Sequence, residues 1–265
     1  MLRVGFIDYL NCLPLRLGLG QTGGLKGVDL VGGTPAEVNA ALLSGDVNIG
    51  LISSASWAQN LVRLKRIPGY GITSNGSVMS VLLAARRGRP LEEAGRVALT
   101  SESATSHSLA KIILEQVHGA SPSYKVVSML PERAVAEYDA ALFIGDTALR
   151  IRSMSGVTVH DLGDAWRRFV GLPMVYAVWA SQSDPARYEF WSDRVARAVL
   201  WAQANLETVV VEARRLGAPA TDEDLKVYFT SCIGYRVGRC EEEGLGRFLA
   251  EGGLSTSNVY GKVSA

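Results

Sequence analysis

Cysteine and histidine are scarce in this chain of 265 residues. The three cysteines, Cys12, Cys232 and Cys240, are odd in number, and no two of them have the C-x-x-C spacing. This pattern argues against a disulfide framework and favours free thiols in a reducing compartment, so we expect a cytoplasmic protein. The three histidines lack the H-E-x-x-H spacing, and no adjacent grouping of serine, aspartate and histidine suggests a triad, so we expect neither a metal site nor a catalytic triad.

Excess charge and long apolar runs are also missing. The 27 basic and 26 acidic residues leave a formal net charge of +1, so no basic field exists to hold nucleic acid or an anionic membrane. The longest apolar runs, such as residues 140–144, are strand-sized and far below the roughly 18–20 residues of a membrane helix. A first strand is expected almost at Met1, with no signal-peptide pattern ahead of it. We therefore expect no nucleic-acid or membrane partner, and any attraction for an anionic ligand must come from a few local donors.

Three familiar catalytic motifs are absent: G-x-S-x-G, the P-loop, and G-x-G-x-x-G after a strand. These absences argue against a serine hydrolase, a P-loop NTPase and a dinucleotide-dependent enzyme.

Short apolar strands alternate with helical patterns, which predicts an α/β protein built from βα units. The clearest helix start is Thr34-Pro35-Ala36-Glu37, because Thr34 can cap, Pro35 suits the first turn and Glu37 completes a capping box. That helix is expected to end at Ser44 and Gly45. Residues 192–216 are helical almost throughout, with a break at Asn205, which can cap the segment that follows.

Two long apolar strands, at residues 78–84 and 172–179, bracket about ninety residues of βα pattern. If both strands pass between lobes, residues 1–84 and 178–265 form one lobe that contains both termini. Residues 85–177 then form an inserted second lobe, of a plausible size for a small domain.

Three strand-to-helix junctions are rich in hydroxyl groups: residues 53–56, 101–106 and 145–147. Helix N-termini offer unpaired backbone N–H groups and partial positive charge, so each junction is a candidate carboxylate cradle. The alternative is that serine and threonine are simply good helix caps. The middle junction has more hydroxyls than one cap requires. The candidates at these junctions are Ser53, Ser101, Ser103, Thr105, Ser106, Gly145 and Asp146.

Two further polar positions stand out. Asn11, with Tyr9 beside it, follows the first strand, where an open α/β sheet gathers its ligands; the alternative is an Asx-turn. Ser80 lies inside an apolar strand, where its hydroxyl either bonds a neighbouring backbone group or lines a binding surface. The aromatic residues Trp166, Tyr176 and Trp179 can wall a ring-shaped ligand or, as is more usual, belong to the core.

Several segments, in this order along nearly the whole chain, resemble the chorismate dehydratases of the futalosine route to menaquinone. Each segment is weakly specific alone, and their order and spacing carry the resemblance. They are Val4-Gly5-Phe6-Ile7, Tyr9-Leu10-Asn11-Cys12-Leu13-Pro14, Gly45-Asp46-Val47-Asn48-Ile49-Gly50, Val78-Met79-Ser80, the 101–106 loop, Ile144-Gly145-Asp146, Asp161-Leu162-Gly163, Trp166, Gly171-Leu172-Pro173, Ala177-Val178-Trp179, Tyr228-Phe229 and Gly244-Leu245.

The resemblance implies a two-lobed type II periplasmic-binding-protein fold with two crossover strands, and a reaction without a cofactor. Chorismate would lose water to give 3-[(1-carboxyvinyl)oxy]benzoate, with the enolpyruvyl carboxylate of the substrate as the base. Asn11 and Ser80 match the family's key polar positions, and we expect them to orient the substrate and the departing hydroxyl. The hydroxyl loop would hold a substrate carboxylate.

Three other functions compete with this one. A solute-binding protein shares the fold but is expected to carry an export signal. A transcriptional effector domain needs a helix-turn-helix ahead of Arg3. The naphthoate-forming sibling enzyme, 1,4-dihydroxy-6-naphthoate synthase, has a different opening motif and relies on a histidine base. The oligomeric state is not predicted.

Overall fold

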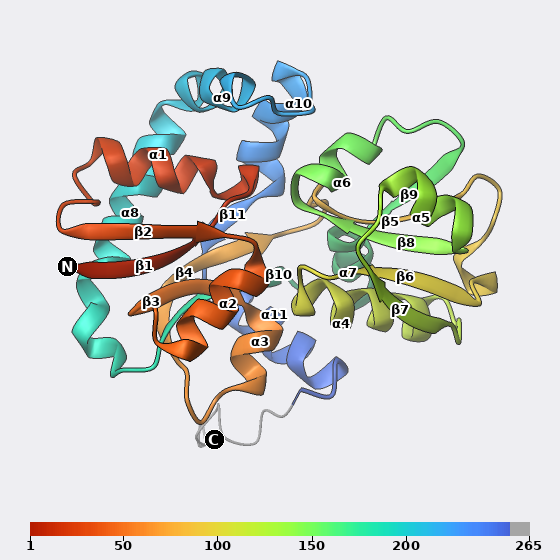
Figure 1. The fold of residues 1–265 in the computed structure, drawn as a ribbon, viewed down its shortest axis with the longest axis horizontal. Helices are drawn as coiled ribbons and strands as arrows, with labels where there is room; N and C mark the ends of the chain where they lie inside the picture. The colour runs from red at the N-terminus through yellow and green to blue at the C-terminus, as the bar shows by residue number, and fades with distance from the viewer. Residues whose placement is uncertain (255–265) are drawn as a thin grey trace.

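The computed structural model describes residues 1–254, which form two lobes, each built around one β-sheet (Figure 1). Both sheets are mixed and are covered by helices, which confirms the predicted two-lobed α/β fold. The polar tail from Ser255, counted with the first lobe in the sequence-based division, lies outside the described residues.

The first lobe has a six-stranded sheet in the order β11-β4-β10-β3-β1-β2. Strand β1 pairs in parallel with β2 and β3, whereas β10 and β11 run antiparallel to their neighbours. The elements of this lobe are β1 (Leu2–Ile7), η1 (Leu10–Cys12), α1 (Leu13–Gln21), β2 (Val28–Gly33), α2 (Pro35–Ser44), β3 (Ile49–Ser53), α3 (Ser54–Gln59), β4 (Lys65–Ser74), β10 (Met174–Ser181), η4 (Pro185–Tyr188), α8 (Glu189–Ala204), α9 (Leu206–Arg215), α10 (Asp222–Val227), η5 (Tyr228–Cys232), β11 (Gly234–Arg236) and α11 (Arg239–Glu251).

The second lobe has a five-stranded sheet in the order β7-β6-β8-β5-β9. Strands β6, β7 and β8 are parallel, and β5 runs antiparallel to both of its neighbours. The elements of this lobe are β5 (Val81–Arg86), η2 (Leu91–Glu93), β6 (Arg96–Thr100), α4 (Ala104–Ile112), η3 (Ile113–Val117), β7 (Ser123–Val127), α5 (Pro131–Glu137), β8 (Ala140–Ile144), α6 (Gly145–Ile151), β9 (Val157–Asp161) and α7 (Leu162–Val170).

The chain passes from one sheet to the other twice, once just before β5 and once just before β10, the two strands that correspond to the long apolar runs. Strand β5 pairs along its length with β8 and β9, and β10 pairs with β3 and β4. Pairing on both sides satisfies the backbone groups of each strand within a single sheet. The chain therefore crosses between the lobes in residues 75–80 and in the segment ahead of Met174, rather than inside the strands. The lobe boundaries at residues 84/85 and 177/178 stay a proposal, and this pairing favours boundaries a few residues earlier.

Local helix signals explain most of the element boundaries. Helix α2 has the predicted capping box, with Glu37 N donating to Thr34 Oγ1 at 3.3 Å and Thr34 N donating to Glu37 Oε2 at 2.7 Å. It ends at Gly45, whose φ of +86° favours glycine. The predicted break at Asn205 is confirmed, and Asn205 is the N-cap residue of α9, but its side chain makes no capping hydrogen bond to that helix. The Asn205 side-chain amide instead donates to the Trp201 carbonyl at 2.8 Å and so satisfies a carbonyl in the last turn of α8.

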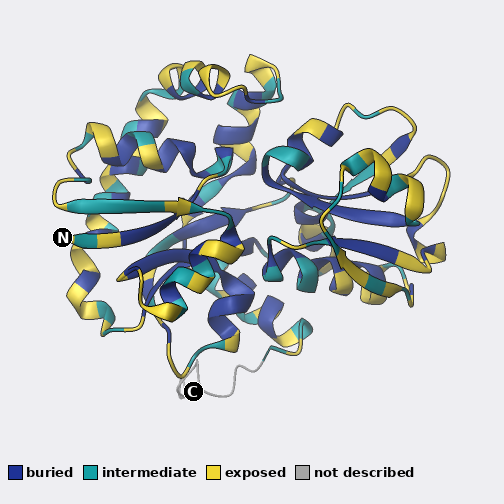
Figure 2. Cartoon of the chain, viewed as in Figure 1, coloured by how far each residue is buried: buried dark blue, intermediate teal, exposed yellow. Residues whose placement is uncertain are grey.

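The cores of both lobes are made of fully buried strands (Figure 2). In the first lobe, Trp179 packs against Trp191 and Phe6, with ring centroids 5.2 and 6.0 Å apart. Trp166 packs against Phe248 with ring centroids 6.0 Å apart. Trp166 and Trp179 are therefore core residues.

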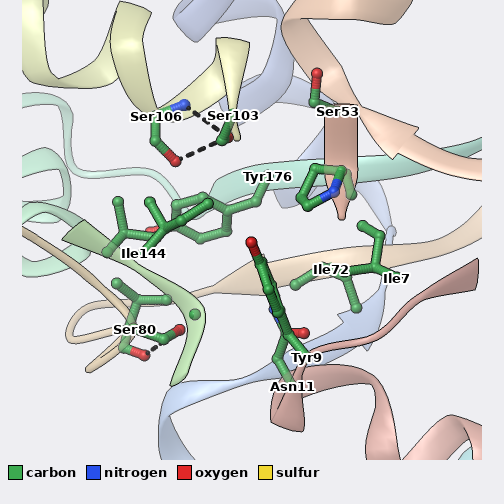
Figure 3. Close-up of a pocket in the computed structure, with 15 residues that line it drawn as sticks. Ile7, Tyr9, Asn11, Ser53, Ile72, Ser80, Ser103, Ser106, Ile144 and Tyr176 are labelled. Carbon is green, nitrogen blue, oxygen red and sulfur yellow. Dashed lines mark hydrogen bonds between the residues drawn. The ribbon is translucent and has the colours of Figure 1, made fainter. Parts of the chain in front are cut away.

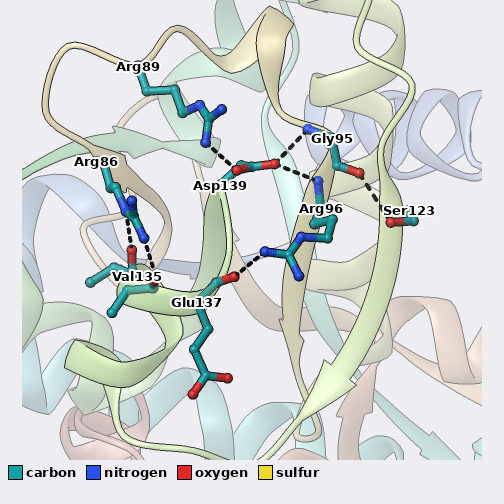
Figure 4. Close-up of polar contacts among 9 residues, drawn as sticks. Arg86, Arg89, Gly95, Arg96, Ser123, Val135, Glu137 and Asp139 are labelled. Atoms are coloured by element: carbon teal, nitrogen blue, oxygen red, sulfur yellow. Dashed lines mark hydrogen bonds and ion pairs between the residues drawn. The ribbon is translucent and has the colours of Figure 1, made fainter.

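The outer end of the second lobe is held by the carboxylate of Asp139 (Figure 4). It accepts hydrogen bonds from Gly95 N at 2.9 Å and Arg96 N at 2.8 Å, and it pairs with Arg89. Burial acts to raise the pKa of Asp139, but the two N–H groups and Arg89 outweigh burial, and the pKa falls below its ordinary value. This carboxylate fastens the start of β6 to the start of β8.

Within residues 1–254, none of the helices combines the length and the apolar character needed to cross a bilayer.

Candidate active site

A cavity of about 480 Å³ lies between the two lobes (Figure 3). Its walls come from the carboxyl ends of β1, β3 and β8, from the start of α4, and from the segment that enters β5. Ligands of open α/β sheets collect at such strand ends. The lining residues are Ile7, Tyr9, Asn11, Pro35, Ser53, Ile72, Tyr176 and Ala177 from the first lobe, with Val78, Ser80, Val81, Ser103, Ser106, Ile144 and Gly145 from the second lobe and its connection.

The structure brings seven of the ten predicted site residues into this cavity: Tyr9, Asn11, Ser53, Ser80, Ser103, Ser106 and Gly145. Three others lie elsewhere. Ser101 is exposed and lines a separate hollow of the second lobe. Thr105 and Asp146 form contacts between the lobes, described below.

Asn11 presents an unpaired acceptor on the first-lobe side of the cavity. Its Oδ1 atom is buried and has no hydrogen-bond partner among the described residues. The backbone at Asn11 is held in place, because the Tyr235 hydroxyl donates to the Asn11 carbonyl at 2.8 Å. An unsatisfied buried acceptor costs about 1–3 kcal/mol, so its presence calls for an explanation. A hydroxyl donor on a ligand would complete this group.

Ser80 reaches the cavity from the second-lobe side (Figure 3). Its side chain is buried, and its hydroxyl donates to the Val78 carbonyl over a long 3.3 Å. This bond is near the limit of hydrogen-bond geometry, so the hydroxyl is available to a better partner.

The hydroxyls at the helix starts are caps as well as lining groups. Ser103 Oγ accepts from Ser106 N at 3.2 Å, and the two side-chain oxygens lie 3.0 Å apart. Ser53 Oγ accepts from Ser56 N at 3.2 Å. The cap interpretation is therefore confirmed for both junctions, and both caps still face the cavity.

Three hydrogen bonds join the lobes around the cavity. The Tyr9 hydroxyl donates to Glu102 Oε2 at 2.7 Å. Leu10 N donates to Asp146 Oδ1 at 3.0 Å, and Ala55 N donates to Thr105 Oγ1 at 3.0 Å. Together these bonds tie the two lobes to each other beside the cavity.

The electrostatics of the cavity are those of neutral dipoles. The described lining residues include no Asp, Glu, His, Lys, Arg or Cys side chain. Burial, reinforced by Glu102, raises the pKa of Tyr9, and burial raises the pKa of Tyr176, so both phenols stay protonated near neutral pH. Burial also raises the pKa of Asp146, against the opposing effect of the Leu10 N–H bond. An anionic ligand would meet hydroxyls, amides and the N-terminus of α4.

Within residues 1–254, no three His, Cys, Asp or Glu side chains gather in a group able to hold a metal ion.

Sequence reasoning missed two kinds of residue. The apolar lining, including Ile72, Val81 and Ile144, reads from the sequence as ordinary strand core. Asn39 of α2 supports Ser53 by accepting from its backbone N–H at 3.1 Å, and Glu102 meets Tyr9 across the cleft. Glu102 lies inside the hydroxyl-rich loop, which was the one available signal.

A larger hollow of about 1140 Å³ lies in the first lobe beside Phe229 and Tyr235. It lacks the second-lobe hydroxyls and the unpaired Asn11 oxygen, so the cavity between the lobes is the better candidate site.

The two lobes, each with its own mixed sheet, place the chain in the class of two-lobed α/β folds, and solved structures agree. A Candida albicans protein described as having the generic periplasmic-binding-protein fold covers 97% of this chain and 92% of its own, with 13% identity and a TM-score of 0.72. The periplasmic aliphatic sulphonate binding protein of Escherichia coli covers 96% and 85%, with 13% identity and a TM-score of 0.68. These likenesses establish the fold.

The family is defined by sequence. Residues 2–252 match the family described as menaquinone biosynthesis, and the chain belongs to this family. A chorismate dehydratase of Thermus thermophilus is 33% identical over 81% of this chain and 82% of its own. A chorismate dehydratase of Campylobacter jejuni is 23% identical over 92% and 95%.

Proposed function

We propose that this protein is a chorismate dehydratase, a hydro-lyase that converts chorismate to 3-[(1-carboxyvinyl)oxy]benzoate and water in menaquinone biosynthesis. The observation that supports it most is the cavity between the lobes, where Asn11 and Ser80 come together from opposite sides. Membership of the menaquinone-biosynthesis family and the two dehydratase relatives support the same substrate.

The proposed reaction needs no strong acid or base from the protein. The substrate ring loses a hydrogen and a hydroxyl from adjacent carbons and becomes aromatic, so the elimination is downhill. The lining of neutral dipoles fits a base supplied by the substrate's own enolpyruvyl carboxylate, as the family resemblance implies. The protein then contributes orientation and the exclusion of water.

We assign the roles from the hydrogen bonds that each residue leaves open. The buried Asn11 Oδ1 accepts from the ring hydroxyl, and this bond and the Ser80 hydroxyl together orient the hydroxyl that departs. The N-terminus of α4, with Ser103 and Ser106, holds a carboxylate.

Tyr9, Ser53 and Gly145 complete the substrate surface. Thr105 and Asp146 act through lobe closure, because their acceptor oxygens are already bonded to the opposite lobe.

We propose a cytoplasmic location, because Cys12, Cys232 and Cys240 are all free thiols.

Purified protein mixed with chorismate, with no added cofactor, should release an aromatic product lighter by one water. Mass spectrometry and ultraviolet absorption would follow it, and a chelator should leave the rate unchanged. Recovery of intact chorismate from folded protein would reject the assignment. Conversion of cyclic dehypoxanthinyl futalosine instead would identify the naphthoate-forming sibling, and saturable binding without turnover would identify a solute-binding protein.

A further inference from the structure

The carboxylate of Asp161 lies outside the cavity lining but holds the segment that carries Ser80. Met79 N donates to Asp161 Oδ2 at 2.8 Å, and Val78 N lies 3.1 Å from both carboxylate oxygens. The Ser77 hydroxyl also donates to Oδ2, at 2.7 Å. One side chain therefore binds three consecutive residues of the passage between the lobes.

The segment held in this way has a strained backbone. Met79 has a φ of +58° and is the one non-glycine residue with positive φ among residues 1–254. Ser80 N donates to the Val78 carbonyl at 2.7 Å, so Met79 is the centre of a three-residue turn. A γ-turn with positive φ at its centre is rare and strained. Such strain costs about 1–3 kcal/mol and persists only where the surroundings enforce it, as they often do at functional sites.

The strained turn ends directly at Ser80. Beyond it, the Ser80 carbonyl accepts from Gly145 N at 2.9 Å, so the residue is fixed on both sides. Without the turn, Ser80 would follow an ordinary extended path into β5, and its hydroxyl would leave its present place in the cavity wall.

We propose that Asp161 is a positioning residue for Ser80: its carboxylate enforces the strained turn at Met79 and so aims the Ser80 hydroxyl at the substrate. This inference rests on the proposed function and extends it to a residue that does not line the cavity.

Asp161 has a second, purely structural task that a test must separate. Its Oδ1 accepts from Gly163 N at 2.9 Å and Asp164 N at 3.1 Å and thereby caps α7. The Ser77 hydroxyl and Met79 N bond only to Oδ2, the α7 cap bonds only to Oδ1, and Val78 N reaches both oxygens. Asp161→Asn keeps one acceptor oxygen, and asparagine is as good an N-cap as aspartate, so this variant weakens the turn while preserving the cap.

Asp139→Asn is the matched control. Asp139 also binds two consecutive backbone N–H groups, at Gly95 and Arg96, but at the outer end of the second lobe (Figure 4). We expect Asp161→Asn to lower kcat by about tenfold or more with KM changed less than about threefold. We expect Asp139→Asn to lower the melting temperature at least as much and to leave kcat within about twofold.

The decisive comparison repeats Asp161→Asn in a Ser80→Ala background, measured by single turnover at high enzyme concentration. If Asp161 acts through Ser80, adding Asp161→Asn to Ser80→Ala should lower the single-turnover rate by less than about twofold. An equal loss in both backgrounds, or an unchanged kcat in folded Asp161→Asn, would overturn the positioning role.

If Asp161→Asn does not fold, Ser77→Ala is the substitute, because it removes one partner of Oδ2 without touching the α7 cap. It should lower kcat about two- to threefold, and no change in kcat would overturn the role. An inactive wild type would instead reject the proposed function itself.

Discussion

The two sides of the cavity treat their polar groups differently. On the second-lobe side, the Ser103 and Ser106 hydroxyls are bonded to each other and to the start of α4. On the first-lobe side, Asn11 Oδ1 is buried and has no partner among the described residues. The satisfied hydroxyls keep a helix terminus in shape for an anion, whereas the unsatisfied oxygen is reserved for a donor that the protein does not supply. The difference separates the start of α4, which binds a carboxylate, from Asn11, which with Ser80 orients the reacting hydroxyl.

The largest expected effect is at Asn11. Asn11→Ala removes the unpaired acceptor, and loss of one oriented hydrogen bond in a closed site lowers kcat by roughly 100- to 1000-fold. Chorismate turnover and thermal melting would be measured together. Ser54→Ala is the matched control, because the Ser54 hydroxyl is buried and donates to the Val175 carbonyl at 2.8 Å outside the cavity. An Asn11→Ala protein that melts early while its kcat per folded molecule is normal would make Asn11 structural.

Ser80→Ala should cost somewhat less, on the order of 100-fold in kcat. The reason is that the Ser80 hydroxyl already has a partner in the Val78 carbonyl, from which it must turn away to reach the substrate. Steady-state kinetics beside the Asn11 variant would rank the two residues. A rate within a few-fold of wild type would remove Ser80 from the catalytic set.

Tyr9→Phe tests closure of the lobes. It deletes the 2.7 Å bond to Glu102, and a typical hydrogen bond contributes about 0.5–1.5 kcal/mol net, so KM should rise about two- to tenfold. Tyr124→Phe is a close match, because the Tyr124 hydroxyl donates to Glu115 at 2.8 Å on the outside of the second lobe. Equal KM values in the two variants would show that the Tyr9–Glu102 bond does not serve binding.

The smallest effect is expected from pH. Burial raises the pKa of Tyr9 and Tyr176 above the ordinary value, so kcat should stay flat between about pH 7.5 and 9.5. The pH dependence of the unfolding free energy has a definite direction. Both neutral phenols stabilise the fold fully below the unfolded pKa of about 10, and this stabilisation is lost as the pH rises above it. Tm measured from pH 8 to 11 should fall above pH 10, and less steeply in Tyr176→Phe. A rise in kcat across pH 8–9.5 would indicate a titrating group that takes part in the reaction.

Local signals in the sequence were enough for much of the fold. The capping box at Thr34 and the apolar run at residues 140–144 determine their elements through neighbouring residues alone, and the structure has both. The exact places where the chain passes between lobes have no local signal, because strands β5 and β10 are apolar on both faces whether they cross or not. Only pairing with distant strands decides the sheet in which each one lies.

The site was predictable where a residue type was unusual for its position. Asn11 after a strand and Ser80 within an apolar run are such residues, and both line the cavity. Thr105 and Asp146 were equally visible but bond across the cleft, a role that depends on how the lobes meet. The strained turn at Met79 has no sequence signal, since methionine is an ordinary strand residue and the turn is imposed by Asp161, more than eighty positions away.

A crystal structure of Ser80→Ala with chorismate would show where the substrate lies, because the slow variant should hold the substrate intact. We expect chorismate in the cavity between the lobes, with its ring hydroxyl within hydrogen-bond distance of Asn11 Oδ1 and a carboxylate at the start of α4. Chorismate bound in the larger hollow beside Phe229 and Tyr235, or seated between the lobes with its hydroxyl away from Asn11, would contradict it.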